Sequence, residues 1–118
     1  MDAARARTAR LPLEGQGSGT VLGGPPETVT LRSGLVVLEP GRGVGAHSTG
    51  DHEEILVVLE GEGELRVQGV DPLPLAPDRV GYCPPRTEHD VVNTGTTRLR
   101  YLYVVAKVPE AAGGGAGA

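Results

Sequence analysis

The sequence has no phenylalanine and no tryptophan, and 3 tyrosines are its only residues of the Phe, Trp and Tyr group. Hydrophobic residues make up 38% of the 118 positions, below the usual share of a globular protein. A core must therefore be built from valine, leucine and the few tyrosines. The length is typical of one domain with a single core.

Cysteine is almost absent, and Cys83 is the single cysteine of the sequence. This excludes an intrachain disulfide and favours a reducing compartment. The amino terminus lacks the apolar segment of a signal peptide, and no apolar run is long enough to cross a bilayer. The sequence therefore predicts a cytoplasmic protein with no membrane partner.

Basic residues are absent from the stretch in which acidic residues are concentrated. The formal net charge is −4, and residues 51–64 hold several acidic residues but no lysine or arginine. Three arginines at positions 5, 7 and 10 form the one basic cluster, which is typical of a solvated chain end. Nucleic-acid binding needs a basic patch or stripe, so we expect no nucleic-acid partner.

Glycine and proline are abundant, with 19 and 10 residues, and most of them lie between apolar runs. This composition predicts many short strands joined by turns rather than helices. We therefore expect an all-β fold, a sandwich or barrel of roughly eight strands. The expected strands cover residues 28–31, 35–39, 54–59, 64–67, 80–83, 89–93 and 99–105, with a short or edge strand within 70–77.

Three segments between the strands carry specific expectations. Residues 14–26 read as a loop, and residues 32–34, Arg-Ser-Gly, read as a turn. The turn at residues 60–63 is expected to join its flanking strands as a hairpin. The domain division that follows is a flexible amino-terminal arm at 1–27, a β-barrel domain at 28–108 and a disordered Gly/Ala tail at 109–118.

The histidines are confined to two stretches that lead from turns into strands. His47 and His52 lie within residues 41–63, and His89 lies within residues 78–93. This distribution indicates a site assembled between strands. Residues two apart on a strand share a face, so His52 can point inward together with Glu54. Imidazole and carboxylate groups suit divalent zinc, iron, manganese, nickel or copper.

The spacing within these stretches resembles the two motifs of the cupin superfamily, which are small double-stranded β-helix, or jelly-roll, barrels. In the first stretch five residues separate a glycine from His47, and six separate Glu54 from the next glycine. The second stretch carries proline, histidine and asparagine at the matching positions, Pro84, His89 and Asn93. The resemblance spans about residues 35–105 and implies a jelly-roll cupin barrel.

The sequence departs from the family pattern at three positions. Thr49 stands where the first motif has its second histidine, and threonine is a poor ligand. Arg86 and Asp78 replace glycines in loops, where these changes have little effect on the expected fold. His52 has no place in the general motif, and it is our candidate to replace the missing histidine.

The resemblance implies that His47, Glu54 and His89 hold one divalent transition metal ion, with His52 as a further ligand. The alternative is a barrel that has lost its metal. Glu53 can face inward in place of Glu54 if the strand register slips by one residue. A carboxylate that is not a ligand is the natural general base, so Glu53 is the candidate catalytic residue.

Other polar residues are candidates for contact with a substrate. We expect Tyr101 and Tyr103 in the core and barrel wall, where a hydroxyl can reach a bound ligand. Arg86 is a candidate for binding an anionic ligand at the barrel mouth, with simple exposure as the alternative. Cys83 is expected to be a small core residue, with a thiolate ligand as the alternative.

The leading hypothesis is a small single-domain cupin that binds one divalent metal ion and acts on a small molecule as a dioxygenase, isomerase or lyase. The first alternative is a non-catalytic module that binds or senses a small ligand. The second is a structural barrel that dimerises. Small cupins commonly pair through their sheets, so the resemblance also implies a homodimer.

Overall fold

The computed structural model describes residues 4–13 and 15–109, and within them it contains strands and no helix. This confirms the predicted all-β class. None of the described residues lies in a helix that is long and apolar enough to span a bilayer. The strands are β1 (Gly19–Leu22), β2 (Leu31–Leu38), β3 (His47–Ser48), β4 (His52–Glu60), β5 (Gly63–Val67), β6 (Leu73–Leu75), β7 (Val80–Cys83), β8 (Glu88–Val92) and β9 (Leu99–Lys107).

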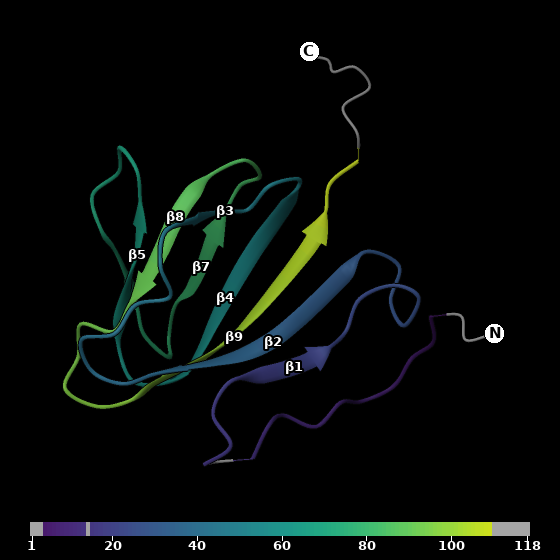
Figure 1. Ribbon diagram of the computed structural model, residues 1–118, viewed down its shortest axis with the longest axis horizontal. Helices are drawn as coiled ribbons and strands as arrows, with labels where there is room; N and C mark the ends of the chain where they lie inside the picture. The colour runs from purple at the N-terminus through teal and green to yellow at the C-terminus, as the bar shows by residue number, and fades with distance from the viewer. Residues whose placement is uncertain (1–3, 14, 110–118) are drawn as a thin grey trace.

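The strands form two antiparallel sheets. The larger sheet has the order β1-β2-β9-β4-β7, and the smaller has the order β3-β8-β5-β6. Figure 1 shows β5 and β8 on one side of the molecule and β2, β9 and β4 on the other. Two antiparallel sheets with these crossovers form the expected jelly-roll. Strand β6, which contains a proline, lies at the edge of the smaller sheet, as its sequence predicts.

The core lies between the two sheets and is aliphatic, as the composition requires. On β4, Leu56 and Val58 are buried at 1% and 3% exposure, while Ile55 and Leu59 on the other face are exposed. This alternation fixes the inner face of the strand. The remaining buried members of the core are Leu38, Leu65, Leu75, Cys83, Val91, Leu99 and Tyr101.

The expected turn at residues 32–34 is wrong. Strand β2 runs through it without a break and pairs with β9 from Leu31, opposite Ala106, to Leu38, opposite Leu99. Gly34 lies opposite Tyr103, and a Cβ atom added at Gly34 would lie 2.7 Å from the Tyr103 hydroxyl. This glycine therefore makes room for an aromatic ring inside a strand, although Arg-Ser-Gly is a composition typical of a turn.

The expected loop at residues 14–26 contains a strand. Strand β1 pairs with β2, with Gly19 opposite Leu35, and forms the edge of the larger sheet. This strand, Gly-Thr-Val-Leu, is only 4 residues long and lies in a stretch rich in glycine, so the sequence did not indicate it. The expected carboxy-terminal tail lies outside the described residues except for Pro109, and the domain division at residues 27 and 109 stays a prediction.

The expected hairpin across residues 60–63 is also wrong. Strand β4 belongs to the larger sheet and β5 to the smaller one, so this turn carries the chain from one sheet to the other. Gly61 has a φ of +86°, and a Cβ atom added there would lie 2.2 Å from the carbonyl oxygen of Arg98. The turn is packed against the start of β9, which directs β5 away from the edge of β4.

Candidate metal centre

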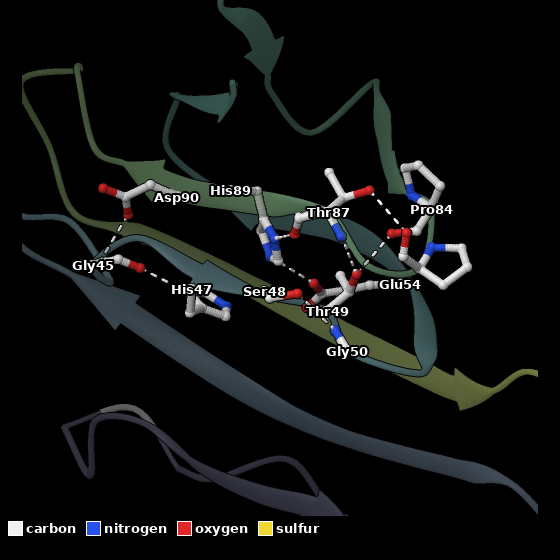
Figure 2. A network of polar contacts seen from close by, with 11 residues as sticks. Gly45, His47, Ser48, Thr49, Gly50, Glu54, Pro84, Thr87, His89 and Asp90 are labelled. Carbon is white, nitrogen blue, oxygen red and sulfur yellow. Dashed lines mark hydrogen bonds and ion pairs between the residues drawn. The ribbon is translucent and has the colours of Figure 1, made fainter. Parts of the chain in front are cut away.

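The centre of the site is a contact between the two sheets. Glu54 lies on the inner side of β4 and His89 lies on β8. The Nε2 atom of His89 is 3.0 Å from the Oε1 atom of Glu54, and their side chains are 1% and 11% exposed. Figure 2 shows the two side chains meeting. Both residues were predicted to lie together, and the fold brings them together.

Cys83 adjoins this pair. It lies on β7 directly opposite Glu54 on β4, and it is fully buried. The donor atoms of Glu54, Cys83 and His89 all lie within 4.8 Å of one another, and no other described residues form such a group. The group can hold a metal ion. Cys83 is buried, as expected, but its closeness to Glu54 depends on strand register, which the local sequence does not reveal.

His47 adds a second imidazole. It lies on β3 opposite His89, and the two ring centroids are 4.3 Å apart with the planes tilted by 55°. The Nδ1 atom of His47 is 2.7 Å from the carbonyl oxygen of Gly45, and that of His89 is 3.0 Å from the carbonyl oxygen of Thr87. A neutral ring that donates from Nδ1 keeps its lone pair on Nε2, the arrangement typical of metal-bound histidine.

His52 lies at the start of β4 and lines the same cavity as Glu54. Its Nδ1 atom is 3.0 Å from the Oδ1 atom of Asp51, and its side chain is 27% exposed. His52 is therefore on the inner face, as the alternation of side chains predicts. It lies outside the close group of donor atoms, and so does His47.

Thr49, which stands where a histidine was expected, has a structural role. Its hydroxyl donates a hydrogen bond to the carbonyl oxygen of Pro84 at 2.7 Å and accepts one from the backbone N–H of Thr87 at 3.0 Å. Figure 2 shows both contacts. They tie the segment after β3 to the turn between β7 and β8, which places His47 beside His89.

Glu54 and the three histidines line a cavity of about 250 Å³ between the sheets, whereas Cys83 is not among its lining residues. Tyr101 and Tyr103, predicted as wall residues, both line it. Arg32 also lines it, and sequence reasoning missed this residue because it assigned residues 32–34 to a turn. The other lining residues are Val36, Val44, His47, Ser48, Thr49, His52, Glu54, His89, Val91 and Val105.

Two predicted site residues lie elsewhere. Glu53 is exposed on the outer face of β4, where its carboxylate accepts a hydrogen bond from the Tyr82 hydroxyl at 2.9 Å. The inward-facing register for Glu53, and with it the role of a base inside the barrel, is wrong because Glu54 occupies the inner face. Arg86 is exposed in the turn before β8 and is not among the residues lining the cavity.

Electrostatics distinguish the donors. The hydrogen bond with Glu54 raises the pKa of His89, and this effect outweighs burial, which acts in the opposite direction. Burial, together with the nearby Glu54 carboxylate, raises the pKa of the Cys83 thiol to about 11. A metal ion that binds Cys83 must therefore displace its proton. Nitrogen, oxygen and sulfur donors together fit zinc and other first-row transition metals.

Comparisons with known proteins agree with this architecture. The family model described as a cupin domain matches residues 34–105. A cupin 2 conserved barrel domain protein from Salinispora arenicola is 23% identical with a TM-score of 0.67, and the match covers 91% of this chain and 92% of that one. No curated protein matches the chain.

Two further structures share the fold at lower identity. An RmlC-like cupin with a double-stranded β-helix fold from Methanocaldococcus jannaschii is 15% identical with a TM-score of 0.71, covering 86% of this chain and 91% of that one. The Cnp3 cupin domain of Schizosaccharomyces pombe is 18% identical with a TM-score of 0.69, covering 77% of this chain and 64% of that one. The family model extends over more than half of the sequence and includes every candidate metal ligand. The chain belongs to the cupin family.

Proposed function

We propose that this cupin binds one divalent transition metal ion, from among iron, manganese, zinc, nickel and copper, and acts on a small molecule in the cavity beside it. The observation that carries the proposal is the buried contact between Glu54 and His89, with the Cys83 thiol within 4.8 Å of both. A buried carboxylate, imidazole and thiol gathered this closely are the donors that such ions prefer.

We assign Glu54 and His89 as the central ligands, because the sequence motif and the geometry both select them. Cys83 supplies a third donor on the side of β7, and His47 presents its Nε2 atom from β3. His52 is the outermost proposed ligand, with its other ring nitrogen held by Asp51. The hydrogen bonds at Nδ1 of each imidazole orient the ring for ligation.

A bound metal ion polarises the oxygen atoms of a substrate and stabilises developing negative charge, as dioxygenase, isomerase and lyase chemistry requires. The chain's own residues supply the rest of the site. Val36 and Val91 contribute apolar side chains to its wall. Tyr101 and Tyr103 also line the cavity, and a tyrosine hydroxyl can position a substrate by hydrogen bonding.

The experiment that tests metal binding is elemental analysis of protein purified without a histidine tag. We expect close to one equivalent of iron, manganese, zinc, nickel or copper by inductively coupled plasma mass spectrometry. The proposal is contradicted if the purified protein contains none of these metals and binds none of them when they are added.

A second function, a module that binds or senses a small ligand without turnover, is favoured by one observation. Glu54 is the only carboxylate that lines the cavity among the described residues, and His89 holds it. Glu53 lies outside, so the described part of the cavity offers no separate carboxylate as a base. A small molecule that co-purifies unchanged with the protein, detected by mass spectrometry after denaturation, would support this function.

We also propose a homodimer formed through the outer face of the larger sheet. This face exposes apolar side chains on β4 and β7, with Val80 66% and Tyr82 51% exposed. Light scattering after size exclusion tests the proposal, and Val80→Glu is expected to shift a dimer to the monomer mass. The cytoplasmic location stays a prediction.

A further inference from the structure

Arg32 is exposed and lines the cavity from β2. It lines the inner side of β2, and its guanidinium makes no ion pair or hydrogen bond with any described residue. In the sheet register Arg32 is opposite Val105 on β9, Val105 is opposite Glu54 on β4, and Glu54 is opposite Cys83 on β7. These residues therefore form one row across four neighbouring strands. With strands about 4.8 Å apart, Arg32 lies two strands, or roughly 10 Å of backbone separation, from Glu54.

Tyr103 on β9 places a hydroxyl close to Gly34, which is two residues from Arg32 on β2. Its ring lies over Gly34, where an added Cβ atom would be 2.7 Å from the hydroxyl oxygen. Arg32 and Gly34 are two residues apart on β2 and share its inner face. The Tyr103 hydroxyl has no hydrogen-bond partner among the residues that the structure describes. A cation on β2 and a hydroxyl on β9, neither with a partner among the described residues, thus line the same cavity on neighbouring strands.

The rest of the cavity separates this pair from the metal donors. Glu54 is the only carboxylate among the lining residues described, and it is paired with His89. Val105 lies between Arg32 and Glu54 in the sheet register, and Val36 and Val91 also line the cavity. A volume of about 250 Å³ admits only a small molecule, since a cavity of roughly 150 Å³ holds benzene.

We propose that the substrate or ligand is a small organic carboxylate. Its anionic group binds the Arg32 guanidinium and the Tyr103 hydroxyl, while a second oxygen atom, at the other end of a short apolar segment, faces Glu54 and His89. The planar guanidinium matches a carboxylate with two parallel hydrogen bonds. This inference rests on the proposed metal site, because the metal centre is what the second oxygen binds.

Two hydroxamates of nearly equal shape test the inference on zinc-loaded protein. Both butyrohydroxamate and succinate monohydroxamate carry the same metal-binding group, and they differ in a methyl or a carboxylate at the far end. Calorimetric titration measures each affinity in the wild type, Arg32→Gln, Tyr103→Phe and Arg66→Gln. Arg66 is the matched control, because it lies on the exposed face of β5, paired with Glu64, and its loss changes the net charge equally.

We expect succinate monohydroxamate to bind the wild type about tenfold more tightly than butyrohydroxamate, the effect of one charge-assisted contact at a partly exposed site. Arg32→Gln should abolish this preference, Tyr103→Phe should reduce it severalfold, and Arg66→Gln should preserve it. Equal binding of the two probes by the wild type overturns the carboxylate site, as does an unchanged preference in Arg32→Gln. If butyrohydroxamate itself fails to bind zinc-loaded protein, the proposed metal site is wrong, and the inference falls with it.

Discussion

The Nε2 atom of His89 lies 3.0 Å from the Oε1 atom of Glu54, and this contact joins β8 of one sheet to β4 of the other. In protein without metal it is a buried ion pair when the imidazole is protonated. In the proposed metal-bound state the same two atoms would be ligands. We therefore expect this one contact to affect both the pH dependence of the metal-free protein and its affinity for metal.

In metal-free protein the pair makes stability depend on pH in a defined direction. The Glu54 carboxylate raises the pKa of His89 in the folded state, so the folded protein holds a proton that the unfolded chain releases at about pH 6.5. The stabilisation is fully present below that pH and is lost as the pH rises through the folded-state pKa of His89. Urea unfolding across this range, with chelator present, measures the effect.

Glu54→Gln is the control for this dependence, because it removes the charge and leaves the imidazole in place. Above pH 6.5 the free energy of unfolding should fall much less in the variant than in the wild type. An NMR titration that gives His89 a pKa at or below its ordinary value contradicts the account of the pair.

Asn93 is expected to be important for stability rather than for metal binding. It is 1% exposed, and its amide donates to the carbonyl oxygens of Leu38 and Thr97 at 2.9 and 2.8 Å. Its Oδ1 atom accepts a hydrogen bond from Gly95 N–H at 2.9 Å. Asn93→Ala leaves these groups unpaired, so we expect a loss of about 2–3 kcal/mol in the free energy of unfolding.

Thr94→Ala, a change at the exposed neighbouring position, should alter the free energy of unfolding by less than about 0.5 kcal/mol. Chemical unfolding of both variants measures the difference. If Asn93→Ala is as stable as Thr94→Ala, the hydrogen bonds of Asn93 do not hold the turn before β9.

Two glycines separate the cost of backbone conformation from the cost of a steric clash. Gly41 and Gly61 have φ values of +83° and +86°, but a Cβ atom meets nothing within 4 Å at Gly41 and lies 2.2 Å from the Arg98 carbonyl oxygen at Gly61. Gly41→Ala should cost about 1–2 kcal/mol in the free energy of unfolding. Gly61→Ala should cost about 1–3 kcal/mol more. Equal costs, measured by thermal and chemical unfolding, contradict the close packing of the turn at Gly61.

Arg86 stands at a family glycine, and its φ of 54° explains the preference for glycine there. Arg86→Gly should stabilise the protein by about 0.5–1 kcal/mol, because the left-handed conformation costs an L-residue more than glycine loses in entropy. Arg42→Gly is the control, since Arg42 is exposed and has no positive φ. A gain in the Arg42 variant that equals that of Arg86→Gly indicates a cause other than backbone conformation.

Sequence reasoning found the features that are local. The alternation along residues 52–58 predicted the inner face of β4, and the motif spacing selected Glu54, His89 and Asn93. It failed where a residue's role depends on a distant strand. Gly34 and Gly61 both signal turns, yet one accommodates Tyr103 within a strand and the other carries the chain between sheets.

The same limit explains the residues that were missed at the site. Cys83 joins Glu54 only through the register between β7 and β4, and Arg32 reaches the cavity only because β2 runs unbroken along β9. Periodicity within one segment cannot reveal which residues of other strands lie opposite. The proposed ligands on the motifs could therefore be selected from the sequence, whereas Cys83 beside Glu54 and Arg32 in the cavity could not.

We propose Glu54 as the carboxylate that binds metal, and its neighbour Glu53 supplies an internal control on the opposite face of the same strand. The most direct measurement is calorimetric titration of zinc into metal-free wild type, Glu54→Gln and Glu53→Gln. We expect one zinc ion per chain in the wild type, an affinity unchanged in Glu53→Gln, and an affinity weakened tenfold or more in Glu54→Gln, by roughly 1.4 kcal/mol at least. Zinc bound as tightly by Glu54→Gln as by the wild type, or a stronger loss in Glu53→Gln, would contradict the account.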